Sequence, residues 1–252
     1  MIITNGDYVD LETPNGLMRT HILKPAAPGR YPAILLYSEI FQVTAPIRRT
    51  AAMLAGHGFI VAVPEIYHEF VPAGEIFPYD QAGSDRGNAL KTTKTIAGYD
   101  ADSRAVVDHF LSRPDCNGKI GVMGICIGGH LAFRAAFNPE VLGTVCFYAT
   151  DLHKATLGAG MHDDSLVRTE DIKGELFMVW GRQDPHVSLE GRTAIQARLN
   201  QAGTRMSWIE VNGAHAFLRD EGIRYDPDLA HSMMQLVFNF FHRRLSEGDH
   251  AV

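Results

Sequence analysis

The chain has 252 residues, of which 46% are hydrophobic and 21% charged, and its formal net charge is −6. This acidic balance, without any block of like charge, argues against nucleic acid as a partner, because phosphate binding requires concentrated Lys and Arg. The N-terminal residues lack the features of a secretory signal, no apolar run could span a membrane, and the cysteines form an odd set of three, so we expect a cytoplasmic protein with free thiols.

The predicted strands begin with a hairpin. Residues 7–25 read as two strands around a Pro-Asn-Gly turn. Short apolar runs follow along the chain, and most are nearly continuous, which is typical of strands buried on both faces of a parallel sheet. These runs occupy residues 31–39, 59–67, 119–125, 141–149, 175–181 and 205–212.

Helical patterns alternate with the apolar runs. They cover residues 45–58, 99–114, 128–138, 188–203 and 227–245. Strands that alternate with helices predict an α/β fold, a mostly parallel central sheet flanked by helices, and we expect residues 1–252 to form a single domain. Residues 67–95 and 150–172 interrupt the alternation, and we expect 67–95 to form a loop or lid over a functional site.

Cys126 lies between Gly124 and Gly128, at the junction of an apolar run and a predicted helix. One hypothesis is packing, because cysteine is often buried and inert, and this describes Cys146 and Cys116 well. A second is a phosphate-binding loop, but the sequence has neither the G-x-G-x-x-G spacing nor the G-K-[ST] ending of such loops. The third is a nucleophile elbow, the G-x-S-x-G turn with Cys in place of Ser, and we favour it.

An elbow would expose the Cys126 side chain to substrate and place an oxyanion donor beside it. The turn presents the side chain at the carboxyl end of the sheet, and it aims the N–H of Ile127 at the point where the nucleophile attacks. This N–H group can stabilise an oxyanion. The glycines are needed because side chains on either side would collide with the strained backbone.

The elbow requires an acid and a histidine, in that order along the chain. Asp184 and His215 follow the apolar runs 175–181 and 205–212, where an open α/β sheet places its chemistry. Separately, Asp184 could be a turn-former before a proline or a helix cap, and His215 a surface residue. Together with the elbow they predict a triad. No spacing of His, Glu or Cys indicates a metal site, and we predict none.

These motifs resemble the dienelactone hydrolase family of α/β-hydrolases. The similarity covers most of residues 14–245 and includes "LYSEIF", "GVMGICIGGHLAF", "GRQDPHV" and "NGAHAFLR". It implies a role for Glu39, which would hold the Cys126 thiol in a resting form and take its proton when substrate arrives. It also implies that the backbone N–H of Ile40 is the second oxyanion donor, in agreement with the general rule for this elbow.

The resemblance further implies two substrate-binding arginines for an anionic lactone. Arg219, four residues after the histidine, matches one of them. Arg86 is the candidate for the other, and Lys91 is an alternative. Ala216 stands where the best-known members have serine, so the sequence departs from the family pattern at this position.

We therefore expect hydrolysis of an ester or lactone bond through a cysteine nucleophile, with dienelactone-type (carboxymethylenebutenolide) substrates. A broad-specificity thiol esterase or thioesterase is the alternative, and a non-catalytic ligand-binding protein of the same fold is less favoured. No cofactor is expected. The partner would be a small-molecule ester or lactone, including anionic ones, and the chain would be a monomer or small homo-oligomer without a membrane partner.

Overall fold

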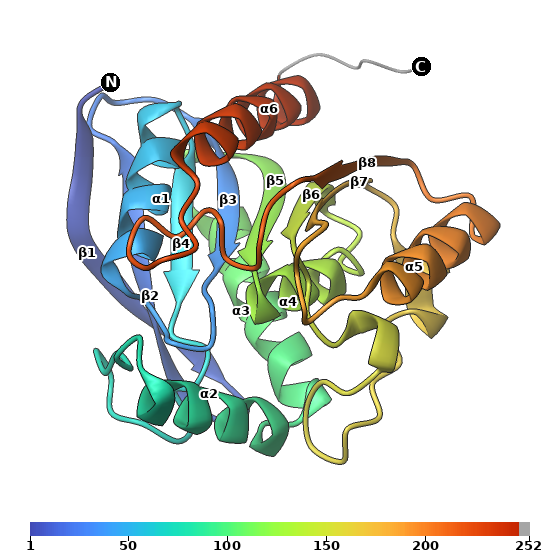
Figure 1. The fold of residues 1–252 in the computed structure, drawn as a ribbon. Coiled ribbons are helices and arrows are strands. Elements are labelled where there is room, and N and C mark those ends of the chain that lie inside the picture. Colours follow the sequence, from blue (N-terminus) through green and yellow to red (C-terminus); the bar gives the residue numbers. More distant parts are fainter. Residues whose placement is uncertain (247–252) are drawn as a thin grey trace.

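Eight strands form one sheet in the order β1-β2-β4-β3-β5-β6-β7-β8 in a computed structural model that describes residues 1–246 (Figure 1). The pairs β1–β2 and β2–β4 are antiparallel and all the others are parallel. The predicted mostly parallel sheet is thus confirmed. The strands are β1 (Ile3–Thr13), β2 (Gly16–Pro25), β3 (Tyr31–Tyr37), β4 (Ile60–Pro64), β5 (Cys116–Ile125), β6 (Val141–Phe147), β7 (Glu175–Gly181) and β8 (Met206–Val211).

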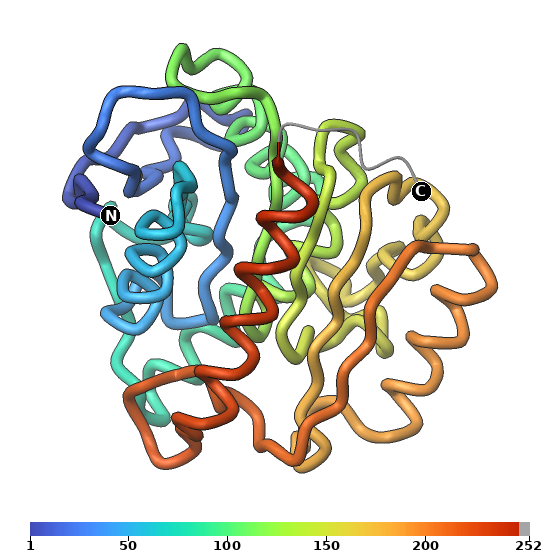
Figure 2. The backbone as a smooth tube through the Cα atoms, turned by 90° about the horizontal axis from the view of Figure 1, so that it is seen from above, coloured from blue at the N-terminus to red at the C-terminus, as the bar shows by residue number. Residues whose placement is uncertain are grey.

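Helices cover both faces of the sheet. Two of them, α1 (Ala45–Gly56) and α6 (Pro227–Leu245), contribute to one hydrophobic cluster, and α6 lies over the middle of the sheet when seen from above (Figure 2). The other face is covered by α3 (Ile96–Ser112), α4 (Ile127–Ala135) and α5 (Leu189–Gln201), which contribute to a second cluster. Each of these five helices was predicted from its sequence pattern.

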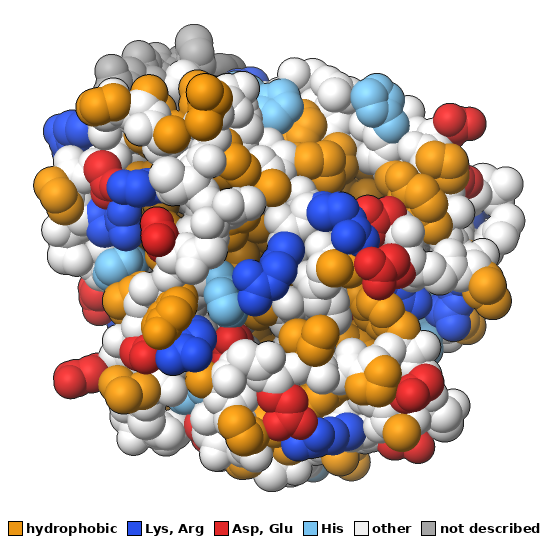
Figure 3. All heavy atoms as spheres, turned by 90° about the vertical axis from the view of Figure 1, so that its left-hand side faces the viewer, with side chains coloured by type: hydrophobic (Ala, Val, Ile, Leu, Met, Phe, Trp, Pro, Cys, Tyr) orange, Lys and Arg blue, Asp and Glu red, His pale blue; other side chains and the backbone are white. Residues whose placement is uncertain are grey.

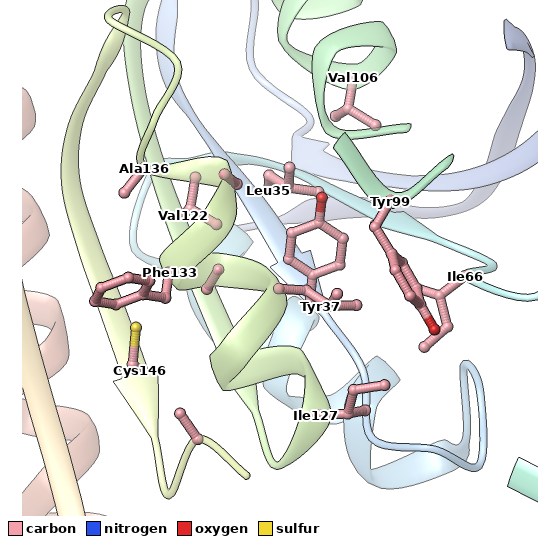
Figure 4. Close-up of a cluster of buried hydrophobic side chains, with 14 of the residues drawn as sticks. Leu35, Tyr37, Ile66, Tyr99, Val106, Val122, Ile127, Phe133, Ala136 and Cys146 are labelled. Atoms are coloured by element: carbon pink, nitrogen blue, oxygen red, sulfur yellow. The ribbon is translucent and has the colours of Figure 1, made fainter. Parts of the chain in front are cut away.

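The alternation of side chains along β3 divides the core between the two clusters. Leu35 and Tyr37 point to the side of α3 and α4, where they lie with Tyr99, Val106 and Phe133 (Figure 4). The intervening residues of β3 belong to the cluster beneath α1 and α6. Because both faces are covered, the strands have the continuous apolar runs that are typical of a parallel sheet.

The segment 67–95, which we expect to form a loop or lid, contains a helix, α2 (Gln81–Thr93), and is therefore not a loop throughout. Asp80 caps this helix by accepting a hydrogen bond from the Gly83 N–H at 2.8 Å. Its sequence shows little apolar periodicity because its buried residues are Gly83 and Gly87. Residues 150–172 contain two short 3₁₀ turns, at Leu152–Lys154 and Val167–Asp171.

On the face drawn in Figure 3, basic and acidic side chains are interspersed. Among the helices of residues 1–246, none combines the length and the apolar character that a membrane span requires.

Candidate active site

Cys126 lies on a strained turn between β5 and α4. Its φ of 64° and ψ of −121° fall in a region that L-residues seldom adopt. A Cβ on Gly124 would lie 1.8 Å from the carbonyl oxygen of Gly128, and one on Gly128 would lie 2.5 Å from that of Ser38. Larger residues at either position would therefore push the turn apart, which explains the G-x-C-x-G spacing.

Neighbouring backbone holds the turn in place. The Cys126 N–H donates to the carbonyl of Phe147 at 3.1 Å, and the Thr150 N–H donates to the carbonyl of Cys126 at 3.3 Å. Both partners belong to the end of β6 and the segment after it. Cys126 is partly exposed, whereas Cys116 and Cys146 are buried.

Asp184 and His215 meet at the same end of the sheet. Asp184 Oδ2 lies 2.7 Å from His215 Nδ1, and both residues are buried. The other carboxylate oxygen, Oδ1, accepts the backbone N–H of His186 at 2.8 Å. Asp184 is thus a turn-former as well as the partner of His215, but it is not a helix cap, because Ser188 caps α5.

The surroundings of His215 favour its protonated form. Burial lowers the pKa of the imidazole, but the neighbouring Cys126 sulfur and the carboxylate of Asp184 outweigh burial and raise this pKa to about 10. The ring of Tyr148 packs edge-on at 4.9 Å and that of His186 at 4.5 Å between centroids. The bond to Asp184 and these two rings therefore hold the imidazole of His215 in place.

Glu39 follows β3 and is only 2% exposed. Its carboxylate lies 3.6 Å from the guanidinium of Arg219, and the Tyr79 hydroxyl lies 3.5 Å from its other oxygen. Burial raises the pKa of Glu39, while Arg219, His215 and Tyr79 act in the opposite direction. A carboxylate with a raised pKa accepts a proton more readily.

Arg219 faces this carboxylate rather than the carboxylates of its neighbours in sequence. Its guanidinium lies 4.3 Å from the centroid of the Tyr79 ring, and its Nε donates to the backbone carbonyl of Glu221 at 3.0 Å. The carboxylates of Asp220 and Glu221 bind Arg49 of α1 instead, at 2.5–2.8 Å. The loop that carries His215 is thus tied to α1 through Arg49.

The other basic candidates lie on α2 and already have acidic partners. Arg86 is exposed, pairs with Glu75 and stacks over Phe77. Lys91 Nζ lies 2.7 Å from Asp151, just beyond β6. The contacts of Arg86 do not include the triad residues, and its role in substrate binding remains a prediction.

The two predicted oxyanion donors lie at the ends of adjacent strands. Ile40 follows β3 and Ile127 begins α4 after β5, and β3 pairs directly with β5. Within residues 1–246, neither amide donates to another backbone carbonyl. A Cβ on Gly87 would lie 2.5 Å from the carbonyl oxygen of Ile40, so α2 packs directly on this loop.

Sequence reasoning missed Tyr79, His186 and Tyr148. Tyr79 lies in the segment that was expected to form a loop or lid, where no pattern indicated its contact with Glu39. His186 is two residues after Asp184 in the Asp-Pro-His turn, which was the available signal. Together with Asp184 and His215 it forms a group that could hold a metal ion, with ligand atoms within 4.8 Å of one another.

A mostly parallel sheet flanked by helices, with a strained elbow after an inner strand, defines an α/β-hydrolase fold. The sequence model of the dienelactone hydrolase family matches residues 18–245. The chain is 38% identical over 257 residues to a Saccharomyces cerevisiae protein named "Putative carboxymethylenebutenolidase", covering 97% of this chain and 93% of that one. It is 26% identical over 227 residues to the "Carboxymethylenebutenolidase" of a Pseudomonas species, covering 90% of each. The chain belongs to the dienelactone hydrolase family.

A solved structure agrees with this assignment at the level of the fold. The Klebsiella pneumoniae protein described as a "Putative Dienelactone Hydrolase" has a TM-score of 0.84 and 20% identity, with 96% of this chain and all of that chain covered. The predicted family and fold are confirmed, and the chain is a hydrolase acting on ester or lactone bonds.

Proposed function

We propose that the chain hydrolyses an ester or lactone through Cys126, with dienelactone-type compounds as its substrates. The observation that carries the proposal is the elbow at Cys126 beside a histidine that is bound to Asp184. The names of the two relatives support the substrate class. No cofactor is required for this chemistry.

The reaction would proceed in two acyl-transfer steps. The Cys126 thiolate attacks the carbonyl carbon, and the N–H groups of Ile40 and Ile127 stabilise the tetrahedral oxyanion. Collapse breaks the bond to the ester oxygen, which takes the proton held by His215. His215 then removes a proton from water, the resulting hydroxide attacks the thioester, and collapse releases the acid and regenerates the thiolate. In a lactone the leaving oxygen stays attached through the ring.

Glu39 would take the thiol proton at the start of this cycle. Its burial, its raised pKa and its position after the strand that neighbours β5 support this role. Substrate that carries a carboxylate could bind Arg219, which now lies beside Glu39. The Glu39 carboxylate would then lose part of the stabilisation that it receives from the positive charge of Arg219. Its pKa would rise, so it would accept a proton more readily.

One observation favours the alternative, a broad-specificity thiol esterase. Arg219, Arg86 and Lys91 each lie beside a carboxylate of the protein itself, so a substrate anion must compete for them. A neutral ester would need none of these cations. The preference between charged and neutral substrates therefore separates the two functions.

The test is hydrolysis of a chromogenic acetate ester and of a dienelactone by the wild type, Cys126→Ala and Cys126→Ser. We expect the alanine variant to be inactive and the serine variant to be folded but slower by about 10²–10⁴-fold, because an alcohol is far less acidic than a thiol. Cys116→Ala is the matched control and should keep the wild-type rates. Wild-type turnover by Cys126→Ala would refute the proposal.

A further inference from the structure

Asp184, His186 and His215 bring a carboxylate and two imidazoles together beside the proposed nucleophile. Their ligand atoms lie within 4.8 Å of one another, and the two imidazole rings are 4.5 Å apart. One carboxylate and two histidines are a common ligand set for zinc. We propose that these residues form a binding site for a divalent cation of zinc's chemistry, and that the bound cation inhibits the enzyme.

The local backbone gives this group its arrangement. The N–H of His186 donates to Asp184 Oδ1 at 2.8 Å, which holds His186 next to the Asp184–His215 pair. Zinc binds nitrogen and oxygen at about 2.0–2.2 Å, so tetrahedral ligand atoms lie roughly 3.4 Å apart. The exposed His186 side chain would have to move inward by roughly 1.5 Å or less, and the Asp184–His215 pair, 2.7 Å apart, would have to open by roughly 0.7 Å.

A second group of potential metal ligands already binds a cationic side chain of the protein. His68, Glu69 and Asp102 also bring their ligand atoms within 4.8 Å of one another. There, however, the ammonium group of the buried Lys94 lies 2.5 Å from Glu69 and 2.7 Å from Asp102. The protein supplies its own cation at that place. Within residues 1–246, the ion pairs and hydrogen bonds of Asp184, His186 and His215 include no Lys or Arg side chain.

Inhibition rests on the proposed function, in which His215 transfers protons. A cation bound to the His215 imidazole occupies the nitrogen lone pair that must accept a proton. If the cation also binds Asp184, His215 loses its carboxylate partner. His186, in contrast, has no part in the proposed hydrolysis. Its contribution to metal binding can therefore be tested apart from the proposed reaction.

The experiment is titration of chelator-treated protein with Zn²⁺ by calorimetry, together with ester hydrolysis at each Zn²⁺ concentration. We expect one site per chain and loss of activity with the same midpoint, reversed by chelator. His186→Gln should weaken both binding and inhibition by about 10- to 100-fold. His231→Gln, an exposed histidine on α6, is the matched control and should match the wild type.

Three results would overturn the inference: no Zn²⁺ binding to the wild type, equal binding by His186→Gln and the control, or full activity in the zinc-bound protein. Each activity is compared with the metal-free rate of the same variant. If the metal-free wild type fails to hydrolyse esters, the proposed function fails instead. The calorimetric comparison still decides whether the site exists in that case.

Discussion

The carboxylate of Glu39 lies 3.6 Å from the guanidinium of Arg219, although one follows the third strand and the other follows the eighth. Both side chains are largely buried, and the Tyr79 ring lies against the guanidinium. This pair joins the proposed proton acceptor for Cys126 to the proposed binder of the substrate anion. A change at either residue should therefore affect the other.

Glu39→Gln should change the pH dependence of stability. Burial raises the pKa of the Glu39 carboxyl above its ordinary value of 4.5, so folding favours the protonated form. Its stabilising contribution is complete below the ordinary pKa and is lost as the pH rises through the folded pKa. The free energy of unfolding of the variant, relative to the wild type, should thus increase over this pH range, measured by urea denaturation.

The same variant should be a poorer enzyme, with kcat lower by about 10²–10⁴-fold if Glu39 accepts the thiol proton. Glu12→Gln, an exposed glutamate on β1, is the control and should follow the wild type in both experiments. A constant stability difference across the pH range would show that Glu39 is ionised to the same extent in the folded and unfolded chains.

Arg219→Ala should discriminate between charged and neutral substrates. A hydrogen bond to a charged group contributes about 1.5–3 kcal/mol, so kcat/KM for an anionic lactone should decrease by about 10- to 100-fold. A neutral aryl ester makes no such contact, so its kcat/KM should change much less than that of the anionic lactone. Arg48→Ala, an exposed arginine on α1, is the control. Equal losses on both substrates would mean that Arg219 positions Glu39 and the His215 loop without binding the anion.

Gly87→Ala should impair catalysis through the proposed oxyanion hole. The added Cβ would lie 2.5 Å from the carbonyl oxygen of Ile40, so α2 or the Ile40 loop must move. Displacing one oxyanion donor reduces kcat by up to about 10²–10³-fold. Gly56→Ala on α1 has no atom within 4 Å of the new Cβ and should leave kcat unchanged. A fully active, folded Gly87→Ala would argue against the Ile40 N–H as a donor.

Cys126 should be the first thiol to react with an alkylating reagent, and its modification should track the loss of activity. It is partly exposed and lies on the elbow beside His215. Burial raises the pKa of both Cys116 and Cys146, which slows their reaction. Peptide mapping after partial labelling measures the order. Inactivation through Cys116 or Cys146 with Cys126 unmodified would contradict the elbow hypothesis.

The sequence predicted those features of the structure that depend on residues close to one another in the chain. The β3 run is apolar because both faces of the sheet are covered, and the elbow needs glycines at 124 and 128 because the backbone is crowded there. Asp184 and His215 could be placed because each follows a predicted strand. The distance between them, 2.7 Å, depends on two loops that meet only in the folded chain.

The features that sequence reasoning missed depend on contacts between distant segments. Helix α2 packs through glycines, so it shows no apolar stripe, although Asp80 and its bond to Gly83 mark its start. The path of residues 67–95 through the fold brings Tyr79 to Glu39. It also gives Arg86 and Lys91 their acidic partners. No pattern in a single sequence specifies that path.

The central claim is that Cys126 forms a covalent acyl intermediate. The most direct measurement is acid quenching of the enzyme during turnover of a chromogenic acetate ester, followed by mass spectrometry of its peptides. The account predicts an acetyl group on the peptide that contains Cys126, in an amount that matches the burst of released chromophore, and none in Cys126→Ala. An acetyl group on another residue with the same burst, or a full burst from Cys126→Ala, would contradict it.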